Sequence, residues 1–206
     1  MNLEPVVRYY TEALARHGAS ARGVDWNSEE SQRLRFDQLA RLWEPGQPPG
    51  SLNDYGCGVG ALCEHLRGRG WTGAYTGFDI APAMIATASD RFAGDAAAQF
   101  VGQEGDLTIA DVSVASGIFN VKLDADDGTW REYVERTLDR LREISRSAFA
   151  FNVLSTWSDP ERRRDYLFYA DPADMLSYCQ RRFSRHVALL HDYPLYEFTM
   201  LVRVPE

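Results

Sequence analysis

A single lysine, Lys122, stands among the 206 residues of this chain. Phosphate-binding loops of the G-x-x-x-x-G-K type need a lysine directly after their last glycine, so the usual kinase and ATPase classes are excluded. Lysine and arginine together number 22, against 30 aspartates and glutamates, and the formal net charge is -8. Nucleic-acid-binding proteins usually carry a basic field, so this balance disfavours a DNA or bulk RNA partner, and the arginines at 162–164 are best explained as a solvated surface.

Cysteine and histidine are sparse and scattered. Cys57, Cys63 and Cys179 form no C-x-x-C pair, and the four histidines show no metal-ligand spacing. We therefore expect neither a disulfide framework nor a resident metal. The first residues lack a basic-then-apolar leader, and no apolar run approaches the length of a membrane span, so we expect a cytoplasmic protein without a membrane partner. The length fits one α/β domain, residues 1–206.

The stretch Ser51–Ile80 carries the most informative pattern. A strand-like segment is followed by D-Y-G-C-G-V-G, then by a short helical segment and a second strand that ends near Asp79. This is the layout of a nucleotide-binding βαβ half. Gly56 allows a sharp turn off the strand, and Gly58 and Gly60 remove Cβ atoms that would keep a ligand from the backbone. The N–H groups at the helix start then face the ligand, and Asp79 can accept hydrogen bonds from ribose hydroxyls.

Two cofactors are compatible with these glycines. Read as G-x-G-x-x-G/A, Gly56, Gly58 and Ala61 fit a dinucleotide fingerprint and leave a nicotinamide cofactor, NAD(P), open. Read as D-x-G-x-G-x-G, Asp54 to Gly60 resembles the first motif of the class I S-adenosylmethionine (SAM)-dependent methyltransferases, and F-D-I resembles their second. Asp54 favours the second interpretation, because a carboxylate at this place would repel a pyrophosphate.

The resemblance implies a fold, and the order of the expected elements agrees with it. That fold is an α/β, Rossmann-like three-layer sandwich with a seven-stranded, mostly parallel sheet in the order 3-2-1-4-5-7-6, the last strand antiparallel. Further strands are expected at about 99–102, 112–121 and 147–154, with helices at 82–92, 129–145 and 171–182. Two final strands, at 186–192 and 196–204, have no helix between them, whereas a nicotinamide-binding sheet would continue with a strand–helix crossover.

Two helices are expected before the first strand, at 3–17 and at 27–43 with Asn27 as N-cap. Leading helices of the family sit against the open edge of the cofactor cleft. We therefore expect residues 1–45 to form a helical cap, or lid, on a SAM-binding core at 51–206. The candidates for a lid or substrate wall are Tyr9, Tyr10, Trp26, Arg35 and Phe36.

The resemblance also implies a cofactor site. In the family the methionine half of SAM lies over the glycine loop, the acid after the second strand binds the ribose, and an acid after the third strand accepts from the adenine amine. The last acid is Asp106 or Glu104, and the spacing does not choose between them. The residues expected to bind the cofactor are Asp54, Tyr55, Gly56, Cys57, Gly58, Gly60, Asp79, Ile80, Met84, Asp106, Ser116 and Gly117.

The methyl acceptor should lie where the apolar run 112–121 ends, at the carboxyl edge of the sheet. The segment G-I-F-N there lacks the Asn/Asp-Pro-Pro-aromatic motif of many amine-modifying members, so adenine-type N-methylation is not expected. His191 and Asp192, near the end of a strand, are the candidate catalytic base. The candidate substrate-binding residues are Trp26, Asn120, Trp157, Tyr166 and Tyr169.

The sequence thus predicts a SAM-dependent methyltransferase that acts on an oxygen or nitrogen atom of a small molecule by in-line displacement. Two alternatives stay open at this point. A non-catalytic SAM-binding regulator would keep the same glycines and Asp79, and only turnover separates it from an enzyme. An NAD(P)-dependent oxidoreductase would bind the nicotinamide cofactor and no SAM.

Overall fold

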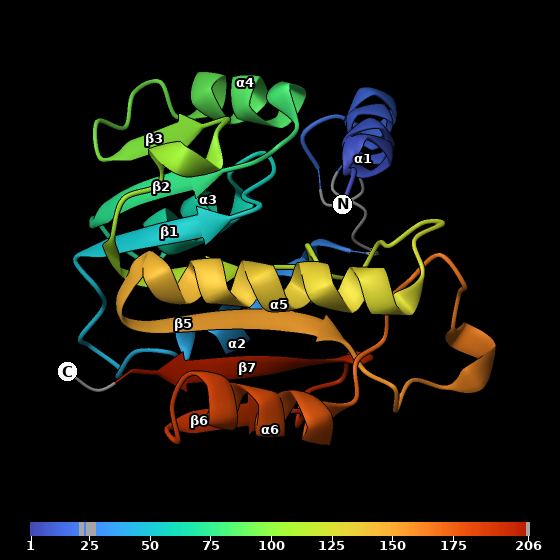
Figure 1. The fold of residues 1–206 in the computed structure, drawn as a ribbon. Coiled ribbons are helices and arrows are strands. Elements are labelled where there is room, and N and C mark those ends of the chain that lie inside the picture. Colours follow the sequence, from blue (N-terminus) through green and yellow to red (C-terminus); the bar gives the residue numbers. More distant parts are fainter. Residues whose placement is uncertain (21–22, 24–27, 205–206) are drawn as a thin grey trace.

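A seven-stranded sheet runs through the centre of the computed structural model, which describes residues 1–20, 23 and 28–204 (Figure 1). Its strand order, β3-β2-β1-β4-β5-β7-β6, confirms the predicted one. The strands are β1 (Ser51–Tyr55), β2 (Ala74–Phe78), β3 (Ala98–Val101), β4 (Ala110–Ala115), β5 (Ser145–Leu154), β6 (Val187–Leu190) and β7 (Glu197–Arg203).

The direction of the strands decides where a ligand can bind. Strands β1 to β5 pair in parallel, whereas β7 is antiparallel to both β5 and β6. The carboxyl ends of the parallel strands therefore meet at one edge of the sheet, and the beginning of β7 lies beside them, with Glu197 opposite Leu154. Open α/β sheets bind ligands at this edge.

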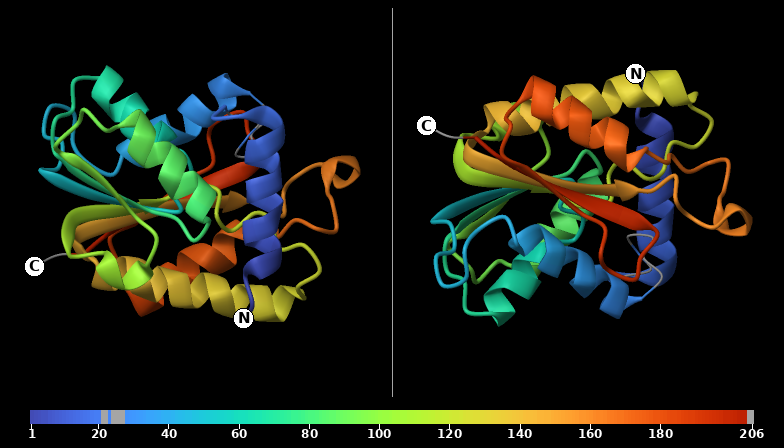
Figure 2. Two further views of the ribbon diagram at one scale, coloured as in Figure 1. Left: turned by 90° about the horizontal axis from the view of Figure 1, so that it is seen from above. Right: turned by 90° about the horizontal axis from the view of Figure 1, so that it is seen from below.

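Helices cover both faces of the sheet (Figure 2). Helices α5 (Asp127–Glu143) and α6 (Pro172–Arg182) pack on one face, while α2 (Glu29–Ala40) and α3 (Ala61–Gly68) pack on the other. Each face has its own apolar cluster, with Trp130 and Leu138 of α5 in the first and Phe36 and Leu39 of α2 in the second. Because β4 and β5 are covered on both sides, they have the apolar runs typical of buried parallel strands.

The remaining helices lie nearer to the ligand edge. Helix α4 (Pro82–Arg91) follows β2, and short 3-10 turns occupy Glu104–Asp106 and Pro160–Arg162. Helix α1 (Glu4–His17) crosses the ends of the strands (Figure 2) and packs Val7, Tyr10 and Leu14 against a small cluster that contains Val59 and Met84. Within the described part of the chain, no helix has both the length and the apolarity that crossing a bilayer requires.

Two local predictions need correction. The fourth strand was expected to continue to Val121, but β4 ends at Ala115 because the chain turns at Gly117, whose φ is 77°. The N–H of Gly117 donates instead to the side chain of Asn152 on β5. Helix α2 was expected to begin at Asn27, but Ser28 is its N-cap, and the Ser28 hydroxyl accepts from the N–H of Ser31.

Of the two leading helices, α1 crosses the strand ends while α2 belongs to a helical layer. Arg35 of α2 reaches Glu197 of β7 with 2.7 Å between Nε and Oε2, and both side chains are buried. This pair anchors α2 to the sheet next to the carboxyl edge of β5. The face of α2 that points to the sheet therefore lies beside the expected ligand site.

Candidate active site

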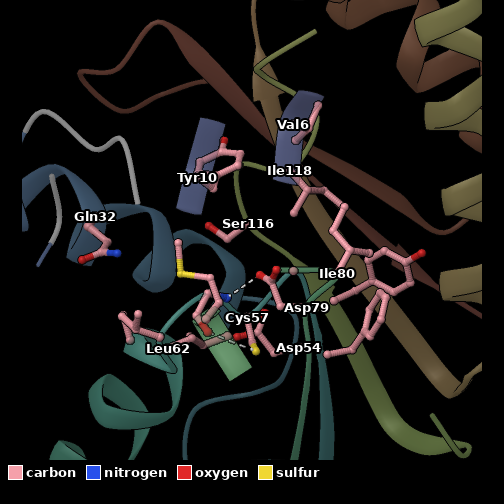
Figure 3. Close-up of a pocket in the computed structure, with 18 of the residues that line it drawn as sticks. Val6, Tyr10, Gln32, Asp54, Cys57, Leu62, Asp79, Ile80, Ser116 and Ile118 are labelled. Atoms are coloured by element: carbon pink, nitrogen blue, oxygen red, sulfur yellow. Dashed lines mark hydrogen bonds between the residues drawn. The ribbon is translucent and has the colours of Figure 1, made fainter. Parts of the chain in front are cut away.

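An open cavity lies at the carboxyl edge around β1 (Figure 3). Residues from α1, α2, the β1–α3 loop, the end of β2, the turn after β4, and α5 surround it. Its lining consists of Leu3, Val6, Tyr10, Gln32, Phe36, Asp54, Tyr55, Gly56, Cys57, Gly58, Val59, Ala61, Leu62, Phe78, Asp79, Ile80, Met84, Ser116, Gly117, Ile118 and Tyr133.

The glycine loop between β1 and α3 requires its glycines for steric reasons. Gly56 has a φ of 84°, and a Cβ atom there would come within 2.1 Å of Cγ2 of Ile118. The N–H groups of Gly56 and Cys57 both donate to the carbonyl oxygen of Phe78, at 2.7 and 2.9 Å. The loop is thus bent back onto the end of β2, and its backbone edge forms part of the cavity wall.

Asp79 is held rigidly at the end of β2. Its Oδ2 accepts from the N–H of Gly58 and its Oδ1 accepts from the N–H of Ala81, both at 2.9 Å. Burial raises the pKa of Asp79, and these two N–H donors oppose that rise. Each carboxylate oxygen keeps a further lone pair, so the fixed carboxylate can still accept hydrogen bonds from the two hydroxyls of a ribose.

Asp54 lies at the floor of the cavity with only 2 % of its surface exposed. Its Oδ2 accepts from the hydroxyl of Tyr75 at 2.5 Å, whereas its Oδ1 has no hydrogen-bond partner among the described residues. Burial raises the pKa of Asp54 to about 7, the Tyr75 hydrogen bond lowers it, and the nearby charge of Asp79 raises it. Burial of an oxygen without a hydrogen-bond partner costs free energy, so a ligand that donates a hydrogen bond to this atom would be favoured.

The part of the cavity around Ile80 is aromatic and apolar. Tyr55 and Phe78 meet edge to face with 4.9 Å between ring centroids, and Tyr133 of α5 and Ile80 complete this end. The hydroxyl of Tyr55 donates to Oε1 of Glu104 at 2.5 Å. Glu104 and Asp106 are both exposed and neither lines the cavity itself, but only Glu104 is tied to a cavity residue by this hydrogen bond.

Ten of the twelve residues expected at the cofactor line this cavity: Asp54, Tyr55, Gly56, Cys57, Gly58, Asp79, Ile80, Met84, Ser116 and Gly117. The other two are Asp106 and Gly60, and neither lines the cavity. Gly60 is the N-cap of α3 and has a φ of 78°. Burial raises the pKa of Cys57 well above its ordinary value, so its thiol stays neutral in the cavity wall.

The residues expected at the acceptor are not brought to the cavity. Asn120 is buried behind it, where its side chain accepts from the N–H of Leu154 and its carbonyl from the N–H of Phe168. Trp157 is 77 % exposed on an arm that projects beyond the strand ends (Figure 1), and this arm also carries Tyr166 and Tyr169. Trp26 lies outside the described residues.

His191 and Asp192 follow β6, which is four places from β1 in the sheet, or roughly 19 Å at the usual strand spacing. Both are exposed, neither lines the cavity, and Asp192 pairs with Arg41 at 3.5 Å. The structure therefore separates the expected base from the cavity. Among the described residues, no group of three His, Cys, Asp or Glu side chains has the arrangement of a metal site.

Several lining residues were not expected. Ile118 lies in the stretch that was expected at the carboxyl edge of the sheet but was not named as a site residue, and Leu3 and Val6 were interpreted only as part of an amphipathic helix. Tyr133 neighbours Trp130 and Val134 of the apolar stripe of α5, and this neighbourhood was the available signal. The sequence contained no such signal for Gln32, because a glutamine in a polar helix gives no indication that it faces a cavity.

Comparisons with known proteins agree with this geometry. A family model described as "Methyltransferase domain" matches residues 26–167. A protein of Mycobacterium tuberculosis named "Putative methyltransferase Rv1506c" is 51% identical over 155 residues, which cover 75% of this chain and 93% of that protein. The chain belongs to the methyltransferase domain family, which confirms the predicted membership of the class I enzymes.

Solved structures share the fold at low sequence identity. The N-methyltransferase NodS from Bradyrhizobium japonicum WM9, in complex with S-adenosylhomocysteine, aligns with a TM-score of 0.67 and 16% identity over 96% of this chain and 99% of its own. The plantazolicin methyltransferase BpumL, also in complex with S-adenosylhomocysteine, aligns with a TM-score of 0.64 and 12% identity over 98% of this chain and 91% of its own.

Proposed function

We propose that this methyltransferase binds SAM in the cavity around Asp54 and Asp79 and transfers its methyl group to an oxygen or nitrogen atom of a small molecule. The observation that carries the proposal is the buried Oδ1 of Asp54, which has no partner among the described residues and lies beside the glycine loop. A donor group such as the ammonium of SAM would complete it, whereas a pyrophosphate would be repelled. S-adenosylhomocysteine in the complexes of NodS and BpumL supports the same choice.

The residues present fit the parts of SAM. Asp79 would hold the ribose hydroxyls, the backbone edge of Gly56 to Gly58 would hold the methionine half, and Tyr55, Phe78 and Ile80 would hold the adenine in the apolar end. Glu104 is the better candidate for the adenine amine than Asp106, because the Tyr55 hydroxyl ties it to the cavity. When bound, SAM supplies a methyl group already activated by the sulfonium charge.

The chain itself has to orient the acceptor and to exclude water. Leu3, Val6 and Tyr10 of α1 line the cavity from the side of the strand ends, so α1 is suited to cover it. Apolar and aromatic side chains surround most of the space and provide few groups that would compete for the methyl group. Electrostatic contacts inside such a dry site are stronger than in water.

Calorimetric titration of the purified protein with S-adenosylhomocysteine, SAM and NAD(P) tests the cofactor. We expect binding of the two sulfur compounds at micromolar concentrations and none of NAD(P). Release of S-adenosylhomocysteine in the presence of a pool of small-molecule acceptors then tests turnover and separates an enzyme from a regulator. Binding of NAD(P) without binding of SAM would contradict the proposal.

A further inference from the structure

A second recess, which we call the helix groove, opens where α2, α3 and α4 meet the loop after β1. Its polar lining includes His65, Arg33, Arg69 and Arg91, and its apolar lining includes Phe36, Val59 and Ala61. These apolar residues and Gln32 also line the cofactor cavity, so the two recesses adjoin. The histidine and the arginines have no part in the cofactor assignment, and they decide what the helix groove can bind.

His65 is the most enclosed of these polar groups. Its side chain is only 9 % exposed, and its Nε2 lies 2.9 Å from Oδ1 of Asp37. An ionised carboxylate can only accept, so Nε2 carries the hydrogen. Burial lowers the pKa of His65, the charge of Arg69 lowers it further and Asp37 opposes both effects, so the ring is neutral at pH 8. Its Nδ1 bonds no described residue and offers a lone pair to a donor in the helix groove.

The arginines give the helix groove a positive balance. Three of them line it, against two carboxylates, Glu29 and Glu64, whose side chains are mostly exposed. Asp37, which pairs with Arg69 at 2.6 Å, does not line the groove. The chain as a whole carries a net charge of -8, so this balance is opposite to that of the molecule. The helix groove therefore favours an anion.

The arginines also keep donors for a ligand. A guanidinium has five N–H donors, and Arg69 uses only Nη2, for Asp37. Arg91 donates from Nη1 to the carbonyl oxygen of Val59 at 2.7 Å and from Nη2 to Glu64 at 2.8 Å. The other N–H groups of these two arginines bond no described residue. Their planar forks match the paired oxygens of a carboxylate or phosphate.

We propose that the helix groove is a second ligand site, which binds a small organic oxyanion bearing a hydroxyl group. The arginines hold the oxyanion, and Nδ1 of His65 accepts from the hydroxyl. Gln32 and Phe36 of α2 face both recesses, as do Val59 and Ala61 at the start of α3. A ligand that holds α2 against α3 stabilises the arrangement that also forms the cavity wall, so it strengthens cofactor binding. This coupling rests on the proposed function, whereas the binding of the oxyanion does not.

Calorimetric titration of the full chain at pH 8 with citrate and with tricarballylate tests the site. The two anions carry the same carboxylates and differ only in the central hydroxyl of citrate. We expect both to bind, and citrate about threefold more tightly, because only citrate supplies a donor to His65. Equal affinities would overturn the role of His65, and lack of binding by both anions would overturn the site.

Three variants locate the binding. Arg69→Gln should weaken citrate binding about tenfold, whereas Arg146→Gln should leave it unchanged. Arg146 is the matched control, because both arginines are exposed and paired with a carboxylate, but Arg146 lines neither recess. His65→Phe, checked for folding by urea denaturation, should bind citrate and tricarballylate equally. An equal loss in the two arginine variants would show a general attraction of charge and overturn the proposal.

Titration with S-adenosylhomocysteine in saturating citrate tests the coupling. We expect S-adenosylhomocysteine to bind about threefold more tightly than without citrate, and citrate to gain the same factor from S-adenosylhomocysteine. Unchanged affinity would overturn the coupling, and competition would show that citrate occupies the cofactor cavity and overturn the second site. Binding of citrate without any binding of S-adenosylhomocysteine would instead overturn the proposed function, so the two failures are distinguishable.

Discussion

Two parts of the cavity lining differ in how the chain supplies them. The part assigned to the cofactor comes largely from one continuous stretch, in which Asp54, the glycine loop, Asp79 and Met84 follow one another through β1, α3, β2 and α4. The rest of the cavity lining, which includes Gln32 of α2, Ser116 after β4 and Tyr133 of α5, comes from elements far apart in the chain. A continuous stretch leaves a motif in the sequence, whereas a wall assembled by the fold leaves none.

The largest expected effect is that of Gly56→Ala. The positive φ disfavours any side chain, and the new Cβ would meet Ile118 at 2.1 Å. We expect the free energy of unfolding to fall by roughly 2–5 kcal/mol and S-adenosylhomocysteine binding to be lost. Urea denaturation and calorimetry measure the two effects. Gly94→Ala is the control, since a Cβ there has no atom within 4 Å, and an equal loss in both variants would contradict the steric argument.

The comparison of the two parts also explains how far the sequence could lead. Most strands and helices, the glycine turn and Asp79 were predictable, because strand and helix periods and the D-x-G-x-G-x-G spacing are local patterns. The strand order followed from the family that this spacing resembles. The end of β4 at Ala115 was not, since it depends on the bond from Gly117 to Asn152 on another strand. Gln32 could not be found either, because its burial follows from the Arg35–Glu197 pair that anchors α2.

Asp54 should make stability depend on pH. Its pKa is raised to about 7 in the folded chain from 3.8, so the folded state binds the proton more tightly than the unfolded state. Stability contributed by this proton is complete below pH 4 and declines as the pH rises to about 7. Urea denaturation at pH 4.5 and pH 8 should show a decline on the order of 3 kcal/mol more in the unaltered chain than in Asp54→Asn. Equal declines in stability in the two proteins would show that the pKa of Asp54 is not raised in the folded chain.

Asp79→Ala probes the cofactor end without a clash. Removal of the carboxylate leaves the ribose hydroxyls and the N–H groups of Gly58 and Ala81 without their acceptor. We expect S-adenosylhomocysteine affinity to weaken by roughly 1–3 kcal/mol, measured by calorimetry, and the free energy of unfolding to fall by about 1–2 kcal/mol because the two N–H groups lose their acceptor. Asp90→Ala, on the exposed side of α4, is the control. Unchanged affinity in Asp79→Ala would show that the ribose is held elsewhere.

The substitutions that distinguish Glu104 from Asp106 should have a smaller effect on S-adenosylhomocysteine affinity. Glu104→Gln weakens the acceptor that holds the Tyr55 hydroxyl and would face the adenine amine, so S-adenosylhomocysteine affinity should fall by about 1 kcal/mol. Asp106→Asn should leave the affinity unchanged, since the Asp106 side chain, unlike that of Glu104, has no hydrogen bond to a residue of the cavity lining. Calorimetric titration of both variants with S-adenosylhomocysteine distinguishes the two residues. A loss of affinity in Asp106→Asn but not in Glu104→Gln would show that Asp106 binds the adenine.

The smallest effect is expected where the sequence had suggested catalysis. His191 and Asp192 are exposed beyond β6, and the exposed Arg41–Asp192 pair contributes about 0–1 kcal/mol of stability at most. Since neither side chain lines the cavity, His191→Ala and Asp192→Ala should leave the rate of S-adenosylhomocysteine release unchanged with any accepted substrate. A general base has to lie within hydrogen-bond reach of the proton that it removes, so a large fall in kcat would mean that this hairpin moves toward the cavity when the acceptor binds.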